Sequence, residues 1–198
     1  MFTGIIENMA QVIEIKHTQG NISLILKSSL ADDFKIDQSV AHNGCCLTVE
    51  SIDAASLTYQ VTAIHETLKK TTLGSWRIGD NINLERSMQH NGRLDGHIVQ
   101  GHVDAVGLCI GRADQDGSWK FTFRYVGDQL TVEKGSITVN GVSLTVVDVK
   151  PNEFSVCIIP YTFNNTTFHS LNVGDQVNLE FDIIGKYVHQ YMKAYENR

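Results

Sequence analysis

Long hydrophobic runs are missing from this sequence. No segment approaches the ~20 consecutive apolar residues that a helix needs to cross a bilayer, and the first residues, MFTGIIE, lack the basic start and apolar core of a signal peptide. Basic residues are also few, because 16 Lys and Arg stand against 22 Asp and Glu, a net charge of -6. These absences disfavour membrane binding and nucleic-acid binding, which needs a basic face, and we expect a soluble, cytoplasmic protein.

Cysteine is scarce as well. The four cysteines include no C-x-x-C pair, and Cys45 and Cys46 are adjacent, which suits tetrahedral metal binding poorly. So few cysteines in 198 residues do not make a disulfide framework. Cys109 and Cys157 are expected to be small buried hydrophobic residues.

Motifs for common cofactors are also absent. The sequence has no phosphate-binding P-loop, no dinucleotide-binding glycine pattern and no H-E-x-x-H motif. His97 and His102 are five residues apart and would face opposite sides of a strand. We therefore predict neither a metal site nor an organic cofactor.

An internal duplication is what the sequence does contain. Residues 43–49 (NGCCLTV) return as residues 140–146 (NGVSLTV), with five of the seven positions identical. Residues 78–85 (IGDNINLE) return as residues 173–180 (VGDQVNLE) at nearly the same spacing. Ordered matches at one offset indicate two homologous halves that meet near residue 97, each the size of a small domain.

Within each half, the signals are those of strands and turns. Runs rich in β-branched and aromatic residues predict strands at residues 22–26, 57–61, 121–125 and 155–159. The Asn-Gly pairs at 43–44 and 140–141 predict tight hairpins, which we expect near the mouth of a barrel. Single helical turns are expected at 29–34 and 127–130. Many short strands favour a small closed barrel in each half, since closure removes exposed sheet edges.

The C-terminal segment has a different pattern. Apolar residues recur there with helical spacing at Ile184, Tyr187, Val188, Tyr191, Met192 and Tyr195. Two interpretations stay open. The helix lies on its own barrels, or its tyrosine-rich stripe joins copies of the chain, because aromatic residues and methionine are enriched at interfaces.

Candidate reactive groups occupy matched places in the two halves. Cys46 in the first half corresponds to Ser143 in the second, and Ile5 corresponds to His102. Two matched pockets can bind two copies of one small ligand, and the differences between them let the copies play different roles. A simpler interpretation also stays open, in which Cys46 is a buried thiol and the Ser143 hydroxyl bonds to strand backbone.

Four blocks in order carry a resemblance to a known family. They are residues 1–6 (MFTGII), 40–49 (VAHNGCCLTV), 96–104 (GHIVQGHVD) and 140–146 (NGVSLTV). They are similar to the signature blocks of the riboflavin synthase family, alpha chain, and the resemblance covers essentially the whole chain. It implies an all-β fold of two homologous six-stranded Greek-key barrels followed by a C-terminal α-helix. The implied domains are a first lumazine-binding barrel (residues 1–96), a second (97–182) and a trimerisation helix (183–198).

The resemblance also implies a reaction. One molecule of 6,7-dimethyl-8-ribityllumazine donates a four-carbon unit to another, which yields riboflavin and 5-amino-6-(D-ribitylamino)uracil without a cofactor or a metal. In this family the N-terminal barrel of one subunit meets the C-terminal barrel of its neighbour in a homotrimer. An association with lumazine synthase is a further expectation from the resemblance.

The resemblance assigns site residues by position. His102, Ser143 and Thr145 would surround the anion that forms when the C7 methyl group loses a proton, and Cys46 would be a nucleophile or a steric element. Beside Ser143 and Thr145, the first substrate pocket would contain Gly4, Ile5, Ile6, Leu144, Cys157, Ile159, Pro160 and Thr162. Beside Cys46 and His102, the second would contain Leu47, Thr48, Thr62, Ala63, Ile64, Glu66, Thr67, Gly101 and Val103. Further positions near the active site are Phe2, Ser39, Lys134 and Asp182, although Lys134 also fits a solvated turn and Asp182 a helix cap.

Two other functions stay open. A non-catalytic lumazine- or flavin-binding protein would share the duplicated fold, but such relatives lose the Ser-Leu-Thr block and the paired cysteines that this chain has. A purely structural barrel would need no polar residues at matched places and would bind no ligand.

Overall fold

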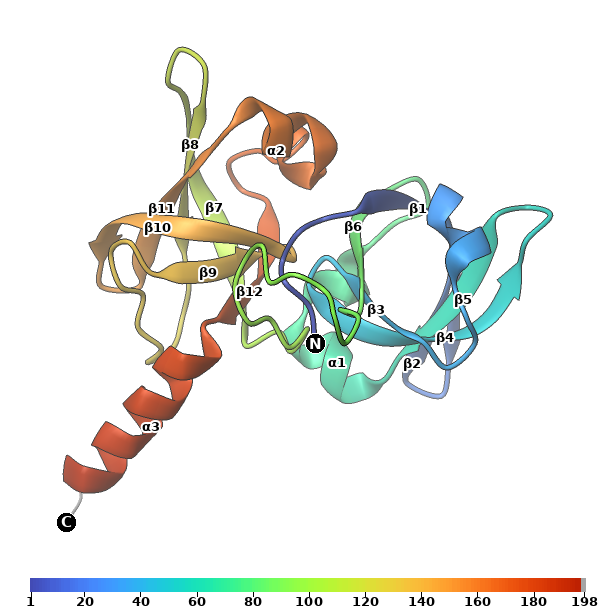
Figure 1. The fold of residues 1–198 in the computed structure, drawn as a ribbon, viewed down its shortest axis with the longest axis horizontal. Coiled ribbons are helices and arrows are strands. Elements are labelled where there is room, and N and C mark those ends of the chain that lie inside the picture. Colours follow the sequence, from blue (N-terminus) through green and yellow to red (C-terminus); the bar gives the residue numbers. More distant parts are fainter. Residues whose placement is uncertain (197–198) are drawn as a thin grey trace.

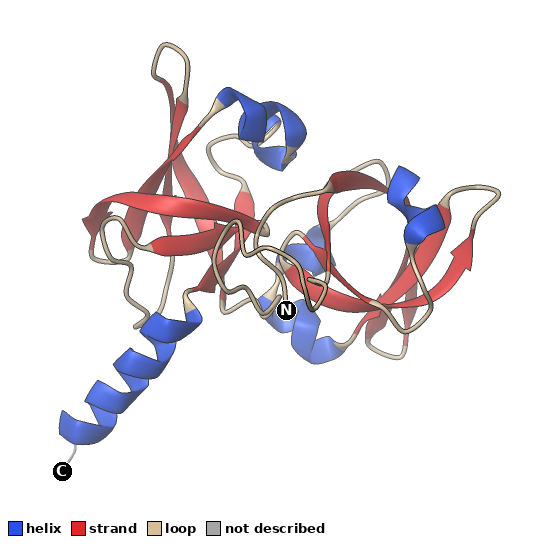
Figure 2. Ribbon diagram, viewed as in Figure 1, coloured by secondary structure: helices blue, strands red, loops and turns tan. Residues whose placement is uncertain are grey.

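Two β-barrels lie side by side, and a C-terminal helix extends away from the second barrel (Figures 1 and 2). This arrangement comes from a computed structural model that describes residues 1–196, so the end of the predicted helix, residues 197–198, lies outside the described residues. The predicted fold class is confirmed. Within residues 1–196, no helix has the length and apolar character needed to span a membrane.

Each barrel consists of six antiparallel strands. The first barrel contains β1 (Asn8–Thr18), β2 (Asn21–Lys27), β3 (Ser39–His42), β4 (Cys45–Asp53), β5 (Thr58–Ala63) and β6 (Asn81–Arg86). The second contains β7 (Ala105–Asp114), β8 (Trp119–Arg124), β9 (Ser136–Val139), β10 (Val142–Lys150), β11 (Glu153–Ile158) and β12 (Gln176–Phe181). The first barrel closes in the order β1-β2-β5-β4-β3-β6, and the second closes in the equivalent order. This Greek-key pattern, repeated in both halves, confirms the duplication.

Short helices connect the strands. They are the 3-10 helices η1 (Ser29–Asp33), η2 (Thr72–Ser75) and η3 (Thr167–His169) and the α-helices α1 (His65–Lys70) and α2 (Pro160–Asn165). The longer helix α3 (Ile183–Glu196) follows β12. The sequence did not predict α1 or α2, because one to two turns are too short to show a helical period.

The four predicted strands correspond to β2, β5, β8 and β11, and the predicted turn at 29–34 is η1. The predicted helical turn at 127–130 is wrong, because this segment is an irregular loop. Its backbone is held by other partners: Gln129 O accepts a hydrogen bond from the Tyr125 hydroxyl (2.8 Å), and Gly127 O accepts one from Asn152 Nδ2 (3.0 Å).

Side chains fill both barrels. In the first, inward positions such as Val12, Leu24 and Leu84 are fully buried, and in the second Phe121 and Phe154 are. This leaves the outer faces of the strands, rather than the barrel interiors, as the place for a small-molecule site.

The two Asn-Gly hairpins meet at the contact between the barrels. Both pairs have positive φ angles, as the predicted turn type requires. A Cβ atom on Gly44 would lie 2.8 Å from the Gly141 nitrogen, so the turns approach backbone to backbone. The two hairpin turns therefore lie at the contact between the barrels, and their place near a barrel mouth stays a prediction.

Two buried asparagines form hydrogen bonds across this contact. Asn83 Nδ2 donates to the carbonyl of Asn140 and Asn178 Nδ2 donates to the carbonyl of Asn43, both at 2.9 Å. Because buried amides without partners are costly, this reciprocal pair fixes how the barrels are placed relative to each other.

Helix α3 does not lie on its own barrels. None of its residues within 183–196 is buried, and its apolar stripe is exposed from Ile184 to Tyr195. The helix is attached to the second barrel by polar groups, among them Lys186 with Asp104 and Lys193 with Asp128. The first of the two interpretations of this helix is wrong, and the stripe is available to a partner.

One buried histidine predicts acid sensitivity. His42 is fully buried, where Nδ1 donates to the carbonyl of Val40 (3.0 Å) and Nε2 accepts from the Tyr59 hydroxyl (2.9 Å). Burial lowers the pKa of His42 from 6.5 to about 4. The unfolded chain therefore binds this proton first as the pH falls from 6.5 to 4. We expect about 3 kcal/mol of stability from this group at neutral pH, lost progressively across that window.

The second barrel provides the control. Val139 and Phe154 occupy its matching positions, so H42V/Y59F copies an apolar pair that the fold already contains. Urea unfolding from pH 7 to pH 4 should show a smaller loss of stability in this variant than in the wild type. Equal losses in the two chains would contradict the assignment.

Candidate active site

Two segments cross between the barrels before the first strand of each half. The first, residues 2–6, precedes β1 but lies against the second barrel: Ser143 N donates to Gly4 O (2.8 Å), and Ile6 packs on that core. The second, residues 99–103, precedes β7 but lies against the first barrel: Cys46 N donates to Gly101 O (2.8 Å). Each half therefore completes the outer surface of the other barrel.

Both crossings require glycine. Gly4 and Gly101 have φ angles of +79° and +78°, and a Cβ atom on them would lie 2.5 Å from Ser143 Cβ and 2.7 Å from Cys46 Cβ. No larger residue fits between the crossing segment and the strand.

A cavity of about 390 Å³ lies where residues 99–103 cross the first barrel. Its walls come from β4, from α1 and from the crossing segment. Of the residues that the resemblance assigned to the second pocket, the cavity brings together Cys46, Glu66, Thr67, Gly101, His102 and Val103. Sequence reasoning missed Cys45, Lys70, Thr71 and Asp104, which also line it.

The remaining residues predicted for this pocket are divided between the two faces of their strands. Leu47 and Ala63 point into the barrel core, so only their backbone can reach a ligand. Thr48 and Thr62 are on the outer face, where the Thr62 hydroxyl donates to Glu50 Oε2 (2.9 Å). Ile64 is exposed at the start of α1.

The two adjacent cysteines differ in environment. The Cys45 side chain packs in the core of the first barrel, and burial raises its thiol pKa to about 12. Cys46 is half-buried on the opposite face of β4, in the cavity wall. Since the thiolate is the reactive form, Cys45 is inert and Cys46 is the candidate nucleophile.

The corresponding face of the second barrel contains the residues predicted for the first pocket. Ser143 and Thr145 point outward from β10, while Leu144 packs against the core together with Ile6. Gly4 and exposed Ile5 cover this face from the crossing segment. Cys109 is buried as expected, but the expectation that Cys157 is buried is wrong, because its side chain is exposed near the end of β11. Ile159 follows at the cap of α2, and Pro160 and Thr162 lie within that helix.

His97 is a residue whose role sequence reasoning missed. It was considered only as a metal ligand, yet its Nδ1 lies 2.7 Å from the Ser143 hydroxyl and its Nε2 lies 3.3 Å from the Thr138 hydroxyl. Burial lowers the pKa of His97, which favours the neutral ring in its hydrogen bond with the Ser143 hydroxyl. The place of His97 in the 96–104 block was the signal that could have identified it.

Within residues 1–196, no group of three or more His, Cys, Asp or Glu residues could hold a metal ion.

The four further positions that the resemblance placed near the active site also lie outside the cavity. Phe2 is fully buried and forms a β-bridge with Val99, so its ring supports the crossing segments. Ser39 pairs with Thr48 at the start of β3. Lys134 is exposed in a turn with φ of 65°, and Asp182 accepts a hydrogen bond from Ile184 N (2.9 Å) at the start of α3. The contacts of Lys134 and Asp182 are those of a solvated turn and a helix cap.

Comparisons with known proteins agree with this geometry. The family model described as "Lumazine binding domain" matches residues 3–87 and again residues 100–182. Riboflavin synthase of Actinobacillus pleuropneumoniae is 40% identical to the chain, covering 97% of the chain and 90% of the relative. Riboflavin synthase of Bacillus subtilis is 38% identical, with 100% and 93% covered. Riboflavin synthase of Schizosaccharomyces pombe is 36% identical, with 98% and 95% covered.

Solved structures show the same fold. LumP complexed with 6,7-dimethyl-8-(1'-D-ribityl) lumazine superposes with a TM-score of 0.83 at 19% identity, covering 91% of the chain and 99% of LumP. LumP complexed with riboflavin superposes equally well, again at 19% identity. At this identity the likeness shows the architecture alone.

Proposed function

The chain belongs to the riboflavin synthase family, and from this membership we infer that it is an enzyme converting two molecules of 6,7-dimethyl-8-ribityllumazine into riboflavin and 5-amino-6-(D-ribitylamino)uracil. The two products together contain all the atoms of the two substrates, so the reaction needs no external oxidant or reductant. The observation that carries the proposal is full-length similarity to riboflavin synthases, combined with two matched outer-face sites in one chain.

We propose that the two sites hold the two substrate molecules. His102 and Cys46 meet at the first barrel, whereas Ser143 and Thr145 are on the second. The 390 Å³ cavity includes neither Ser143 nor Thr145. All four residues can act on one pair of substrates only if the site of a first barrel faces the site of a second barrel. This requirement supports a reaction centre between subunits.

We propose a chemical role for each of these residues. Loss of a proton from the C7 methyl group leaves an anion spread over the ring, which a nearby base and hydrogen-bond donors stabilise. His102 is exposed at the cavity and can take the proton. Ser143, hydrogen-bonded to His97, and Thr145 can donate to the developing negative charge. Cys46 can add to the electrophilic C7 of the acceptor or limit its position sterically.

We propose a homotrimer joined through the exposed stripe of α3, which supports a reaction centre shared between subunits. The proposed domain limits are residues 1–96, 97–182 and 183–198. All of the assigned site residues stay predictions as substrate contacts, including Thr48, Thr62 and Ile64, and Ser39, Lys134 and Asp182, which do not line the cavity. The cytoplasmic location and an association with lumazine synthase also stay predictions.

The direct test is to mix the purified chain with 6,7-dimethyl-8-ribityllumazine alone and to follow riboflavin by absorbance and fluorescence. We expect one riboflavin for every two substrates consumed. Tight binding without product would instead indicate a non-catalytic lumazine carrier. Comparing C46S with the wild type then tests the thiol, because near-normal turnover by C46S would exclude an obligatory thiol nucleophile.

A further inference from the structure

Two buried glutamates occupy matching places in the barrels. Glu85 lies near the end of β6 and Glu180 near the end of β12. Both are buried, with exposed fractions of 4% and 2%. Among the described residues, neither carboxylate forms a salt bridge with a Lys, Arg or His side chain. A buried charge normally needs such compensation, so the question is what these two carboxylates bind.

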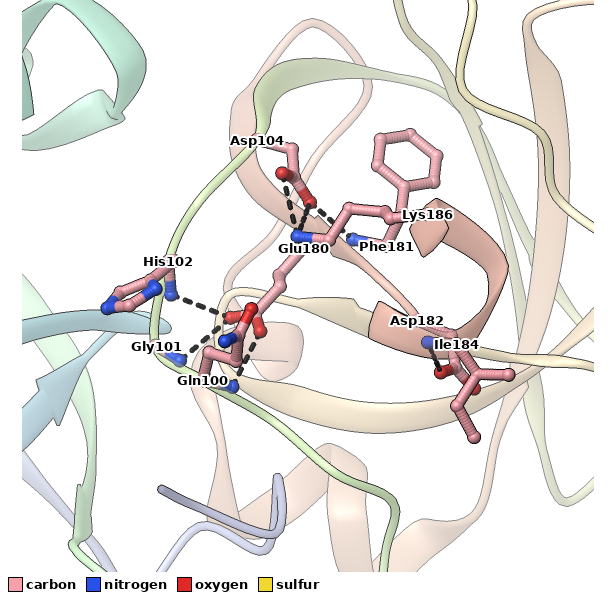
Figure 3. Close-up of polar contacts among 9 residues, drawn as sticks. All are labelled: Gln100, Gly101, His102, Asp104, Glu180, Phe181, Asp182, Ile184 and Lys186. Carbon is pink, nitrogen blue, oxygen red and sulfur yellow. Dashed lines mark hydrogen bonds and ion pairs between the residues drawn. The ribbon is translucent and has the colours of Figure 1, made fainter. Parts of the chain in front are cut away.

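Both bind the backbone of a crossing segment. Glu180 Oε1 accepts from Gln100 N (2.7 Å), and Glu180 Oε2 accepts from Gly101 N and His102 N (both 2.9 Å), as Figure 3 shows. Glu85 Oε1 accepts from Thr3 N (2.6 Å), and Glu85 Oε2 accepts from Gly4 N (2.9 Å). Consecutive amide donors therefore converge on each carboxylate.

Each glutamate serves the site of the opposite barrel. Glu180 belongs to the second barrel, but the segment it holds bonds to Cys46 N through Gly101 O and lines the cavity of the first barrel. Glu85 belongs to the first barrel, but the segment it holds bonds to Ser143 N through Gly4 O on the second.

The far end of each segment is held in a similar way. Asp104 Oδ2 accepts from Phe181 N (2.9 Å), and Asp104 also pairs with Lys186 of α3 (2.9 Å; Figure 3). In the first half, Glu7 Oε1 accepts from Arg86 N (2.7 Å), and Glu7 also pairs with the Arg86 guanidinium. The whole arrangement is thus duplicated, which argues against an accidental set of contacts.

We propose that Glu85 and Glu180 are positioning residues, each of which clamps the crossing segment that completes the ligand site of the opposite barrel. Glu180 sets the place of His102 and Gly101 against Cys46, and Glu85 sets the place of Gly4 and Ile5 against Ser143. The roles of these sites in riboflavin formation rest on the proposed function, but the positioning of the crossing segments by the two glutamates does not.

Glutamine in place of glutamate tests this inference. It keeps the shape of the side chain but puts an NH₂ donor against backbone N–H groups that are themselves donors. Because burial raises the pKa of Glu180 to about 7, the comparison is made at pH 8, where the carboxylate is charged. In E180Q, hydrogen exchange measured by mass spectrometry should then rise about tenfold or more, in line with the value of a hydrogen bond to a charged group. The rise should be confined to residues 99–103 and to Cys46. In E85Q, it should be confined to residues 2–6 and to Ser143.

Each variant serves as the control for the other, and E153Q is a further control. Glu153 pairs with Arg124 on the surface, so its loss should leave both crossing segments unchanged. Equal rises in both segments would indicate general loosening and would overturn the proposal, as would no rise in either. If E180Q does not fold, E180D shortens the side chain while keeping the charge, and the same confined rise is expected.

Ligand binding provides a readout at the site. Titration with 6,7-dimethyl-8-ribityllumazine, followed by its fluorescence, should show about tenfold or more weaker binding at one of two sites in E180Q and at the other site in E85Q. The rise in hydrogen exchange could be confined as expected while the wild type binds no lumazine. That result would support the positioning role of the glutamates and reject the proposed function. Normal affinity at both sites of E180Q would reject the positioning role.

Discussion

If α3 joins subunits as proposed, Y191E is expected to dissociate the assembly and to abolish riboflavin formation while both barrels stay folded. Tyr191 is at the centre of the exposed stripe on α3, and no barrel residue covers it in residues 1–196. A charge placed there cannot be buried against a neighbouring subunit without a large desolvation cost.

The loss of activity follows from the separation of the two sites. Holding two reactants in contact contributes roughly 7–11 kcal/mol to a bimolecular reaction. If the reaction centre forms between subunits, Y191E should lower kcat/KM by at least about a thousandfold. Light scattering after size-exclusion chromatography measures the assembly, and the lumazine assay measures the activity.

Gln190 offers a matched control. It neighbours Tyr191 in sequence and is exposed, but it is not part of the stripe. Q190E adds the same charge to the same helix and should keep both the assembly and the activity. A Y191E chain that is monomeric and fully active would contradict the shared reaction centre.

Replacing Gly101 by alanine is expected to destabilise the fold and to disrupt the site on the first barrel. The new Cβ atom would lie 2.7 Å from Cys46 Cβ and 2.8 Å from the ring of Phe2, which is buried and cannot move away. Alanine is also strained at a φ of +78°. Together, strain and overlap should cost about 3 kcal/mol or more of the free energy of unfolding.

A second glycine separates the two causes. Gly79 has a φ of +98°, but nothing lies within 4 Å of its Cβ position. G79A should therefore cost only about 1–2 kcal/mol of strain and should leave lumazine binding unchanged. Urea unfolding and lumazine fluorescence titration measure the two effects. Equal losses of stability in G101A and G79A would show that the contact with Cys46 is unimportant.

The matched positions were the most informative part of the sequence. Cys46 and Ser143 do occupy equivalent outer-face places in β4 and β10. The prediction for Leu47 and Ala63 did not include the direction of their side chains, because assignment by resemblance does not show which face of a strand a residue occupies. Both side chains lie in the core, as strand alternation requires.

The buried glutamates show a different limit. The repeat of residues 78–85 in 173–180 contains both Glu85 and Glu180. However, acidic residues are rarely buried, and local pattern alone would place both in solvent. Their burial depends on amide donors from segments about 80 positions away, as the contact between Glu180 and Gly101 shows.

Local pattern and the comparison of one half with the other were enough to predict the duplication, the strand-rich character, the Asn-Gly hairpins and the family resemblance. The packing of the whole chain was needed to show that the segments before β1 and β7 cross to the opposite barrels. That crossing brings Cys46 and His102 into one cavity and Ser143 and His97 into contact. Periodicity shows which face of a strand is buried, whereas the segment that buries it depends on contacts between residues far apart in the sequence.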